Sequence, residues 1–524
     1  MNTADFITIT AAIVPDRVGL VDPDERVTFE QFQTRVNRLA QGLLAMGVGK
    51  GSNVGVMSVN SVKFVEAYYA TAAVGATFVP LNFRAKPDEL SYMINTADIG
   101  TLFISERYYP LLQEIRSNVP RVANVITVGF EVAGVPTYDS VVANSEDIPV
   151  FTDIDEDDVS LLIFTSGTTA MPKGVQLSYR ALTALVVNTQ SPPDPSVDQE
   201  VVLASVPFFH IAGASTMASA IFSGRRLVIL PAFDPAAWLQ AVETEGVTHA
   251  FVVPTMLKRV MEVDNFASYN LKSLRGVTYG AAPMPYEVVR RAVEVLPPTI
   301  GLMNAYGQTE ATGSMTFLGP EDHRMDGNPE ENEKKLVRLR SVGRSMPDIE
   351  IGILSPEGKV LATNEDGEIC VRGDRVMRGY HKQEEATSSA IHDGWLHTGD
   401  VGHLDEDGYL FITGRIKDMI IRGGENIAPA EIEQVLEGHP AVAECAVIGV
   451  PDLDWGEVVK ALMIPVQGQS ASEDDLTSYV KTKLASYKAP AIYEWVDDFP
   501  RNHLGKVLKN ELRDMHAAKT ANAV

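Results

Sequence analysis

The feature that most constrains the fold of this chain is a run of hydroxyl and glycine residues that directly follows an apolar, strand-like segment. Residues 159–164 read Val-Ser-Leu-Leu-Ile-Phe, and residues 165–175 then read Thr-Ser-Gly-Thr-Thr-Ala-Met-Pro-Lys-Gly-Val. Hydroxyl groups and glycines let backbone amides approach closely packed anionic oxygens, so the run is typical of a loop that holds a polyphosphate. Its spacing differs from the Gly-x4-Gly-Lys-Ser/Thr of a Walker loop, and ordinary turns favour the same residue types. The composition of the run therefore leaves a phosphate loop and a hydroxyl-rich turn open.

The order of residues within the run favours the phosphate loop. Ser-Gly-Thr-Thr-x-x-Pro-Lys-Gly resembles the signature of the adenylate-forming superfamily, which includes acyl-CoA synthetases, luciferases and the adenylation domains of peptide synthetases. Three further segments resemble that family in the same chain order: Tyr306-Gly307-Gln308-Thr309-Glu310, the stretch from Trp395-Leu396-His397-Thr398-Gly399-Asp400 through Gly414-Arg415-Ile416-Lys417-Asp418, and Pro500-Arg501-Asn502-His503-Leu504-Gly505-Lys506. The resemblance covers nearly the whole chain, and the acyl-CoA synthetase branch, with its fatty-acid–CoA ligases, matches it best.

Length and charge restrict the architecture and the partners. A chain of 524 residues is too long for one hydrophobic core of ordinary size, and short strand-like runs alternate with helical patterns, so an α/β protein with several sheets is expected. A formal net charge of -25 argues against a nucleic-acid partner. The two cysteines, Cys370 and Cys445, are too few for a disulfide framework and indicate a reducing cytoplasm. No apolar run reaches the roughly 18 to 20 residues of a membrane span, so no integral membrane segment is expected.

The clearest domain boundary lies near residues 415–418. There the strand-like segment 409–412 ends, and a glycine-rich segment begins soon after, at Arg422. We expect residues 1–414 to form a large multi-sheet adenylation domain and residues 415–524 to form a smaller α+β domain. The resemblance implies that this smaller domain is mobile about a hinge near Lys417. The polar segment 322–335 is predicted to be a mobile surface loop.

The resemblance also assigns the residues that bind MgATP. The hydroxyl-rich loop would surround the β- and γ-phosphates, and its residues are Thr165, Ser166, Gly167, Thr168, Thr169 and Lys173. Thr309 would contact the α-phosphate, and Glu310, with Thr165, would hold Mg²⁺. Asp400 would accept both ribose hydroxyls, a task suited to the two oxygens of a carboxylate, and Arg415 would support the ribose and phosphate side. The adenine pocket would be formed by Gly280, Ala281, Ala282, Pro283 and Tyr306. Tyr306 would stack on the purine; outside its motif it would be interpreted as a core aromatic residue.

Residues of the smaller domain would act in catalysis and in CoA binding. The resemblance makes Lys506 the catalytic lysine that reaches the substrate carboxylate and the α-phosphate, whereas an arbitrary lysine would be solvated at the surface. Gly423 and Gly424 would allow close approach to the pantetheine tunnel of CoA. Trp455 would line that tunnel or serve only in packing. His210, on the large domain, would gate the passage between acyl pocket and tunnel, or pack against the neighbouring phenylalanines.

The sequence departs from the family pattern at two positions that bear on the backbone. Ala170 and Ala281 stand where the family usually has glycine. If residue 170 requires a positive φ angle, alanine there costs about 1 kcal/mol in conformational strain. We expect such strain to matter most at Ala170, because it lies in the phosphate loop.

These assignments predict a two-step acid–thiol ligase, an AMP-forming acyl-CoA synthetase. It would convert a medium-chain, alicyclic or aromatic carboxylic acid with ATP and Mg²⁺ into an acyl-adenylate, and then with coenzyme A into acyl-CoA. Residues 208–213 lack the aspartate of amino-acid adenylation domains, and the compact segment 414–426 favours CoA over the acceptors of fatty acyl-AMP ligases. A luciferase-like oxygenase and an acyl-binding pseudoenzyme remain as alternatives. Family precedent leads us to expect a monomer or a homodimer, and the particular acid stays unassigned.

Overall fold

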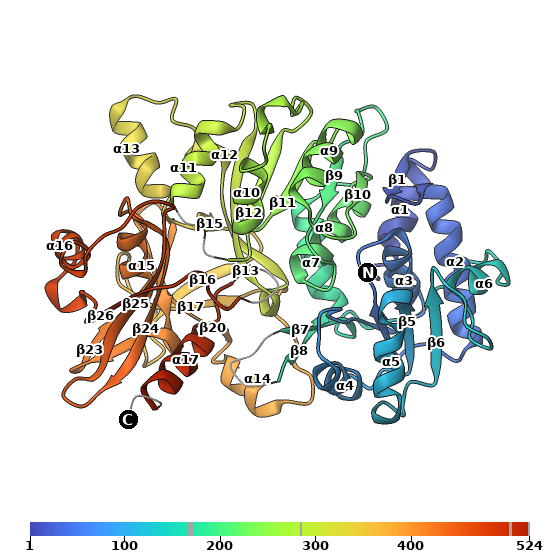
Figure 1. Ribbon diagram of the computed structural model, residues 1–524. Coiled ribbons are helices and arrows are strands. Elements are labelled where there is room, and N and C mark those ends of the chain that lie inside the picture. The colour runs from blue at the N-terminus through green and yellow to red at the C-terminus, as the bar shows by residue number, and fades with distance from the viewer. Residues whose placement is uncertain (166–170, 283, 285, 502–505, 522–524) are drawn as a thin grey trace.

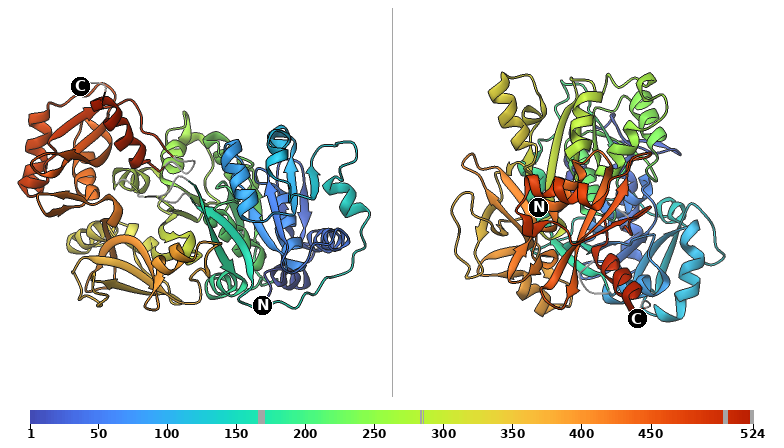
Figure 2. Two further views of the ribbon diagram at one scale, coloured as in Figure 1. Left: turned by 90° about the horizontal axis from the view of Figure 1, so that it is seen from below. Right: turned by 60° about the vertical axis from the view of Figure 1, so that its left-hand side comes forward.

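The computed structural model describes residues 1–524 except 166–170, 283, 285, 502–505 and 522–524. Its described part is a mixed α/β protein in which large sheets are flanked by helices, and a smaller lobe stands at one end of the molecule (Figures 1 and 2). This confirms the predicted fold class. None of the helices in the described part is both long and apolar enough to cross a membrane.

The largest sheet has nine strands, and its central strands run parallel. In spatial order its strands are β15 (Arg344–Ser345), β14 (Gly313–Leu318), β13 (Gly301–Gln308), β12 (Gly276–Gly280), β11 (His249–Val252), β9 (Val201–Ala204), β10 (Arg226–Ile229), β1 (Val18–Val21) and β2 (Arg26–Thr28). The carboxyl ends of parallel strands share one edge of a sheet, where ligands commonly bind. The adenine-side and metal-side segments of the predicted site follow β12 and β13 at this edge.

A second large sheet has seven strands and carries the hydroxyl-rich loop. Its spatial order is β18 (Gly379–Tyr380), β8 (Lys173–Ser178), β7 (Val159–Thr165), β4 (Thr77–Pro80), β3 (Asn53–Met57), β5 (Thr101–Ser105) and β6 (Asn124–Val128). Strands β7 and β8 pair antiparallel, with Thr165 opposite Lys173, so the two ends of the hydroxyl-rich run lie side by side.

The main hydrophobic core contains residues of both large sheets and of five helices that lie between or beside them. These helices are α1 (Asp5–Ile13), α2 (Phe29–Ala45), α3 (Val62–Ala73), α7 (Tyr179–Thr189) and α8 (Ile211–Phe222). The outer face of the nine-stranded sheet is covered by α9 (Pro235–Glu245), α10 (Pro254–Met261) and α11 (Tyr286–Val295). The outer face of the seven-stranded sheet is covered by α4 (Pro87–Thr96) and α5 (Tyr109–Ile115), and α6 (Tyr138–Ala143) packs on α2. Because they share this core, the two large sheets and their helices form a single domain.

Two five-stranded sheets follow in the chain. The first contains β16 (Glu350–Leu354), β17 (Gly367–Arg372), β19 (Ile391–His392), β20 (Trp395–Leu404) and β21 (Leu410–Arg415), with α14 (Glu384–Ala390) preceding β19. The second contains β22 (Ile420–Arg422), β23 (Glu425–Ile427), β24 (Val442–Asp452), β25 (Gly456–Pro465) and β26 (Ile492–Trp495). Helices α15 (Pro429–Glu437) and α16 (Glu473–Lys483) pack on one face of that sheet, and α17 (Lys509–Ala521) packs on the other. The chain passes between the two sheets through the short helical turn Ile416–Asp418, which contains the predicted hinge residue Lys417.

One expectation from the sequence was wrong. The segment 322–335 does not form a loop; most of it lies in the helices α12 (Pro320–His323) and α13 (Pro329–Arg338). Asn328 caps α13 by accepting a hydrogen bond from the Glu331 backbone, and the Glu331 side chain accepts one in return. This capping box, with proline in the first turn, favours a helix despite the high polarity of the segment.

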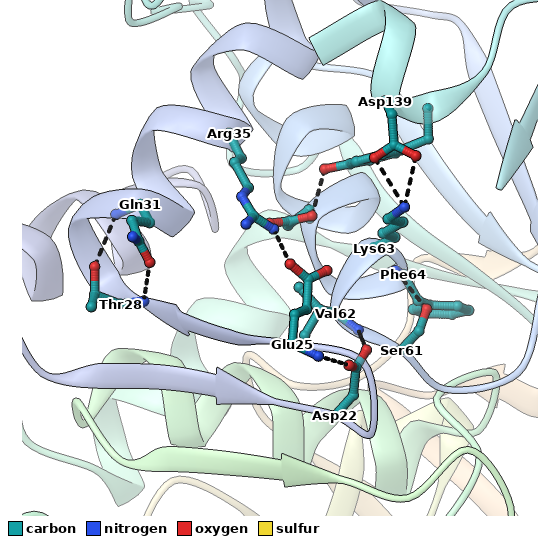
Figure 3. A network of polar contacts seen from close by, with 12 residues as sticks. Asp22, Glu25, Thr28, Gln31, Arg35, Ser61, Val62, Lys63, Phe64 and Asp139 are labelled. Atoms are coloured by element: carbon teal, nitrogen blue, oxygen red, sulfur yellow. Dashed lines mark hydrogen bonds and ion pairs between the residues drawn. The ribbon is translucent and has the colours of Figure 1, made fainter. Parts of the chain in front are cut away.

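A polar network ties α2 to α3 in the large domain (Figure 3). Its centre is Glu66 on α3, a fully buried carboxyl that accepts hydrogen bonds from the Tyr138 hydroxyl and, at 3.4 Å, from Arg35. Arg35 on α2 also pairs with Glu25 (Figure 3). Burial raises the pKa of Glu66 to about 7, although Tyr138 and Arg35 both act to lower it. The network therefore contains a carboxyl group that the fold holds partly protonated near neutral pH.

This raised pKa predicts a specific pH dependence of stability. The folded state binds the Glu66 proton up to about pH 7, whereas the unfolded chain releases it near pH 4.5, so the stability contribution falls as pH rises between these values. Glu66→Gln should remove this loss, so its free energy of unfolding relative to wild type should increase by about 1–3 kcal/mol from pH 5 to pH 8. Urea unfolding of both proteins at the two pH values measures the difference.

The matched control is Glu350→Gln. Glu350 is an exposed carboxylate paired with Arg372, which lowers its pKa, so it is ionised throughout this range. Its replacement should change stability equally at both pH values. An equal change for Glu66→Gln would refute the assigned protonation.

Candidate active site

The hairpin of β7 and β8 presents both ends of the hydroxyl-rich loop at one point. Thr165 and Lys173 are paired residues of the two strands, and the Thr165 hydroxyl lies 3.5 Å from the Lys173 carbonyl oxygen. The Lys173 Nζ lies 4.7 Å from the centre of the Tyr380 ring. The predicted phosphate-binding residues Ser166, Gly167, Thr168 and Thr169, and the departure at Ala170, lie outside the described residues. The structure therefore fixes where the loop starts and ends.

Strand β13 leads into the predicted magnesium and α-phosphate residues. Tyr306 lies on β13, and Thr309 and Glu310 form the short helical turn Thr309–Ala311 that follows it. The Tyr380 hydroxyl donates a hydrogen bond to Glu310 Oε1 at 3.0 Å. Burial raises the pKa of Glu310, and the hydrogen bond from Tyr380 and the charges of Arg415 and Lys173 oppose that rise. A buried carboxylate beside cations suits a hard divalent ion, which prefers oxygen ligands.

Asp400 is the point at which three parts of the chain meet. It is buried on β20, where it accepts a hydrogen bond from the Tyr306 hydroxyl at 2.7 Å and pairs with Arg415 Nε at 2.8 Å. Burial and the adjacent carboxylate raise the pKa of Tyr306 well above its usual value. The Tyr306 hydroxyl is thus engaged by Asp400, and purine stacking by its ring stays a prediction. The structure brings together Tyr306, Asp400 and Arg415, as the sequence predicts.

Lys506, from the smaller domain, approaches the same group. Burial lowers the pKa of Lys506 to about 8; the positive charge of Arg415 lowers it further, and the negative charge of Asp400 opposes the change. The positive charge of Lys417 also lowers the pKa of Lys506, and the negative charge of Asp418 raises it. Charge–charge effects weaken with distance, so the Lys506 ammonium group lies within electrostatic range of Asp400 on the large domain and of Arg415 at the domain boundary.

The backbone at the end of β12 lies very close to that of β13. Gly280 ends the strand, and a Cβ atom there would lie 2.1 Å from the Ala305 carbonyl oxygen, so only glycine fits. Ala281 adopts a φ of 66°, the left-handed conformation that favours glycine. Ala282 follows, and Pro283 lies outside the described residues. Ala281 is therefore strained at its backbone, and the prediction for Ala170, which lies outside the described residues, stays a prediction.

His210 caps the start of α8 beside aromatic residues. Its ring centre lies 4.4 Å from that of Phe209, which in turn packs edge-on against Phe83 at 5.1 Å. A Cβ atom on Gly313 would contact the Ile211 side chain at 3.7 Å, so the first turn of α8 faces the strand that follows Glu310. His210 thus lies among aromatic rings at the start of α8, opposite β14, in surroundings compatible with both gating and packing.

The three residues predicted for CoA binding form a separate group on the smaller domain. Gly423 and Gly424 have φ angles of 59° and 89°, and the Gly423 N–H donates to the Trp455 carbonyl oxygen at 2.8 Å. A Cβ atom on Gly423 would lie 2.8 Å from the Trp455 ring. Trp455 is half-exposed, and the Arg422 guanidinium lies 5.0 Å from its ring centre. Glycine is therefore required beside a tryptophan that solvent still reaches.

Two contacts in the site were missed by sequence reasoning. Tyr380 is one of them, because only the pairing of β18 with β8 brings it to Glu310 and Lys173. The other is Glu368, which accepts hydrogen bonds from the Gly399 N–H at 3.1 Å and pairs with His397 Nδ1 at 2.8 Å. Glu368, Cys370 and His397 lie close enough to share a metal ion. Both oxygens of Glu368, however, are engaged by His397 and Gly399 in the turn that precedes Asp400, which indicates a structural role for this group.

Comparison with known proteins gives a consistent assignment over both domains. The family profile described as AMP-binding enzyme matches residues 8–381, and that described as AMP-binding enzyme C-terminal domain matches residues 431–506. A feruloyl-CoA synthase of Amycolatopsis sp is 37% identical over 494 residues, 93% of each chain. An indoleacetate–CoA ligase of Aromatoleum aromaticum is 33% identical over 99% of each chain. Among solved structures, an o-succinylbenzoate CoA synthetase of Bacillus subtilis in complex with the acyl-adenylate intermediate aligns with a TM-score of 0.82 at 30% identity, over 98% of each chain.

The backbone of Ala281 generates a prediction about stability. Replacing an alanine held at positive φ by glycine removes about 1 kcal/mol of strain, offset in part by the greater freedom of glycine in the unfolded chain. Ala281→Gly should therefore leave the free energy of unfolding unchanged or raise it by up to about 1 kcal/mol. Ala282→Gly, at the adjacent position without a positive φ, should lower it by about 0.5–1 kcal/mol. Urea unfolding of the two variants tests this, and equal destabilisation would contradict the strain at residue 281.

Proposed function

This chain belongs to the AMP-binding enzyme family, and from that premise we propose that it is an ATP-dependent, AMP-forming acyl-CoA synthetase whose acid substrate carries an aromatic ring. In the first step the substrate carboxylate attacks the α-phosphorus of ATP, which gives acyl-AMP and pyrophosphate. In the second step the CoA thiol attacks the acyl carbon, which gives acyl-CoA and AMP. The proposal is carried by the Asp400–Arg415 pair, whose atoms lie 2.8 Å apart and whose two charges both act on the Lys506 ammonium group.

The first step brings two anions together, and the site supplies cations for that purpose. Arg415 and Lys506 are assigned to the α-phosphate side, and Lys173 is assigned to the β- and γ-phosphates. Such preorganised charges stabilise the negative charge of a transition state more than water does. Asp400 would accept the ribose hydroxyls, and Thr309 would contact the α-phosphate.

Mg²⁺ is proposed as the cofactor of this step. Bound Mg²⁺ would neutralise phosphate charge and orient the leaving pyrophosphate. Glu310 is the proposed ligand, because its buried carboxylate is held by Tyr380 at the turn after β13. Thr165, at the start of the hydroxyl-rich loop, is the proposed second contact.

The second step requires Lys506 to leave and the CoA thiol to enter. We assign the change to a rotation of the part of the smaller domain that follows Lys417, the residue that lies in the turn between the two five-stranded sheets. Gly423, Gly424 and Trp455 would then face the pantetheine tunnel, and His210 would stand between tunnel and acyl pocket. The grouping of Gly423, Gly424 and Trp455 on the smaller domain supports a shared role in CoA binding.

The aromatic substrate class rests on two observations. The relatives named above act on feruloyl, indoleacetate and o-succinylbenzoate groups, each of which contains an aromatic ring. The entry to α8 is lined by Phe209 and His210, and offset or edge-on ring contacts favour an aromatic ligand there. The medium-chain and alicyclic acids of the sequence-based prediction remain the competing substrates.

The cytoplasmic location and the oligomeric state of the enzyme stay proposals. Cys370 and Cys445 are free and buried, which suits a reducing cytoplasm. Burial raises the pKa of Cys370 to about 12, so its thiol is unreactive at neutral pH. A monomer or a homodimer is proposed from family precedent.

A panel of acids tests the substrate class. Aromatic acids such as ferulate and indole-3-acetate should give a kcat/KM for AMP release about tenfold above that of alkanoic acids of equal carbon number, because ring contacts add to apolar burial. The assay contains MgATP and CoA, and an omission of CoA separates the alternatives. Pyrophosphate release that never proceeds to acyl-CoA would indicate an acyl-AMP ligase with another acceptor. An absence of ATP turnover with every acid would indicate a pseudoenzyme.

Lys506→Ala should separate the two half-reactions. Loss of the ammonium group should slow pyrophosphate release about 100- to 1,000-fold, since it removes a preorganised charge at the transition state. Thiolation of supplied acyl-AMP should proceed at nearly the wild-type rate. Lys483→Ala, which removes an exposed lysine of the same domain, is the control and should leave both rates unchanged. Equal loss of both half-reactions would contradict the role of Lys506.

A further inference from the structure

Tyr380 contacts two residues of the site that come from different sheets. It lies on β18, where it pairs with Val175 of β8, the strand that begins with Lys173. Its hydroxyl donates to Glu310 Oε1 at 3.0 Å, and its ring lies 4.7 Å from Lys173 Nζ, measured to the ring centre. A single side chain therefore connects the end of the hydroxyl-rich loop to the turn after β13.

We propose that Tyr380 is a positioning residue that holds Lys173 and Glu310 in separate orientations, the ammonium group towards the nucleotide phosphates and the carboxylate towards the metal ion. The inference rests on the proposed function, which assigns those two tasks. Tyrosine suits the position because its ring face attracts a cation while its hydroxyl donates to a carboxylate.

The need for such a residue follows from the charges of its neighbours. The positive charge of Lys173 acts on the Glu310 carboxyl group, so the two groups lie near each other in a buried site. A direct ion pair between them would be strong at low dielectric and would have to break before MgATP could bind. Among the residues that the structure describes, Lys173 and Glu310 form no ion pair, and Tyr380 contacts both. The tyrosine thus replaces a direct lysine–glutamate contact by two weaker ones.

The backbone around Tyr380 is itself held in place. The Tyr380 N–H donates to Thr387 Oγ1 at 2.9 Å, which fixes the end of β18 against α14. The Met377 N–H donates to the Glu310 carbonyl oxygen at 2.7 Å. The segment 377–380 therefore fixes both the main chain and the side chain of Glu310, and a displacement of Tyr380 would be felt by the carboxylate.

Calorimetric binding of ATP, in EDTA and across a series of Mg²⁺ concentrations, tests the inference without catalytic turnover. Tyr380→Phe keeps the ring over Lys173 and loses the donor to Glu310. The Mg²⁺ concentration that gives half of the gain in ATP affinity should rise about tenfold or more, as expected for a lost hydrogen bond to a charged group. Its ATP affinity in EDTA should stay close to that of the wild type. Tyr380→Leu also removes the ring, so its ATP affinity in EDTA should fall about three- to tenfold.

Tyr409→Phe is the matched control, because Tyr409 has the same chemistry outside the site. The hydroxyl of Tyr409 donates to Asp322 at 3.0 Å, and the Arg344 guanidinium lies 4.4 Å from its ring centre. This variant should bind ATP and respond to Mg²⁺ as the wild type does.

The outcomes separate the inference from the proposed function. A wild-type Mg²⁺ response in Tyr380→Phe would overturn the inference, and so would an equal loss of ATP affinity in EDTA and in Mg²⁺, because that indicates general damage to the site. A failure of the wild-type protein to bind ATP would overturn the proposed function and the inference that rests on it.

Discussion

The buried carboxylate of Asp400 is the group on which the rest of the site depends. An unpaired charge at this depth would be strongly destabilising, so the fold has to supply partners for it. It supplies one from each side: the hydroxyl of Tyr306 from the nine-stranded sheet and the guanidinium of Arg415 from the strand directly opposite. Because these partners come from different sheets, satisfying Asp400 also fixes the nine-stranded sheet against the five-stranded one. The position of the carboxylate is therefore set before any nucleotide binds.

A second constraint is the sign of the charge on the whole chain. With a formal net charge of -25, the protein repels ATP at long range, so attraction has to be local. The structure concentrates Arg415, Lys417 and Lys506 in one place, and their mutual repulsion is visible in the lowered pKa values of both lysines, to which burial contributes most. A group of cations that repel one another is strongly stabilised by an anion that binds among them. The local concentration of cations thus compensates for the repulsion of ATP by the net negative charge of the protein.

The sequence predicts the parts of this site that lie on single strands and turns, and it fails where contacts depend on how strands pair. Tyr306, Asp400 and Arg415 were all expected at the site, since each belongs to a short motif. Tyr380 was not, because its contact with Glu310 exists only after β18 joins β8 across about 200 residues of sequence. The prediction for the segment 322–335 fails for a different reason. Its high polarity is typical of a loop, whereas the cap at Asn328 stabilises the helix α13. The left-handed Ala281 shows that a departure from a family pattern marks where strain can occur, but only the backbone shows where it does occur.

The lowered pKa of Lys506 gives the arrangement of the two domains an energetic basis. A pKa lowered from 10.5 to about 8, even with the charges of Asp400 and Asp418 opposing the change, corresponds to on the order of 3 kcal/mol against the charged form, so without a further anion beside it the ammonium group is more stable in solvent. A triphosphate supplies that anion, and a ligand shifts a conformational equilibrium by its differential affinity for the two states. In the proposed rotation of the smaller domain, ATP would therefore favour the orientation that inserts Lys506. Once pyrophosphate had left with much of the negative charge, the same electrostatic cost would favour withdrawal of Lys506 from the position that the thiol has to reach. In the proposed reaction, the charge state of the nucleotide and the orientation of the smaller domain are thus coupled through one buried lysine.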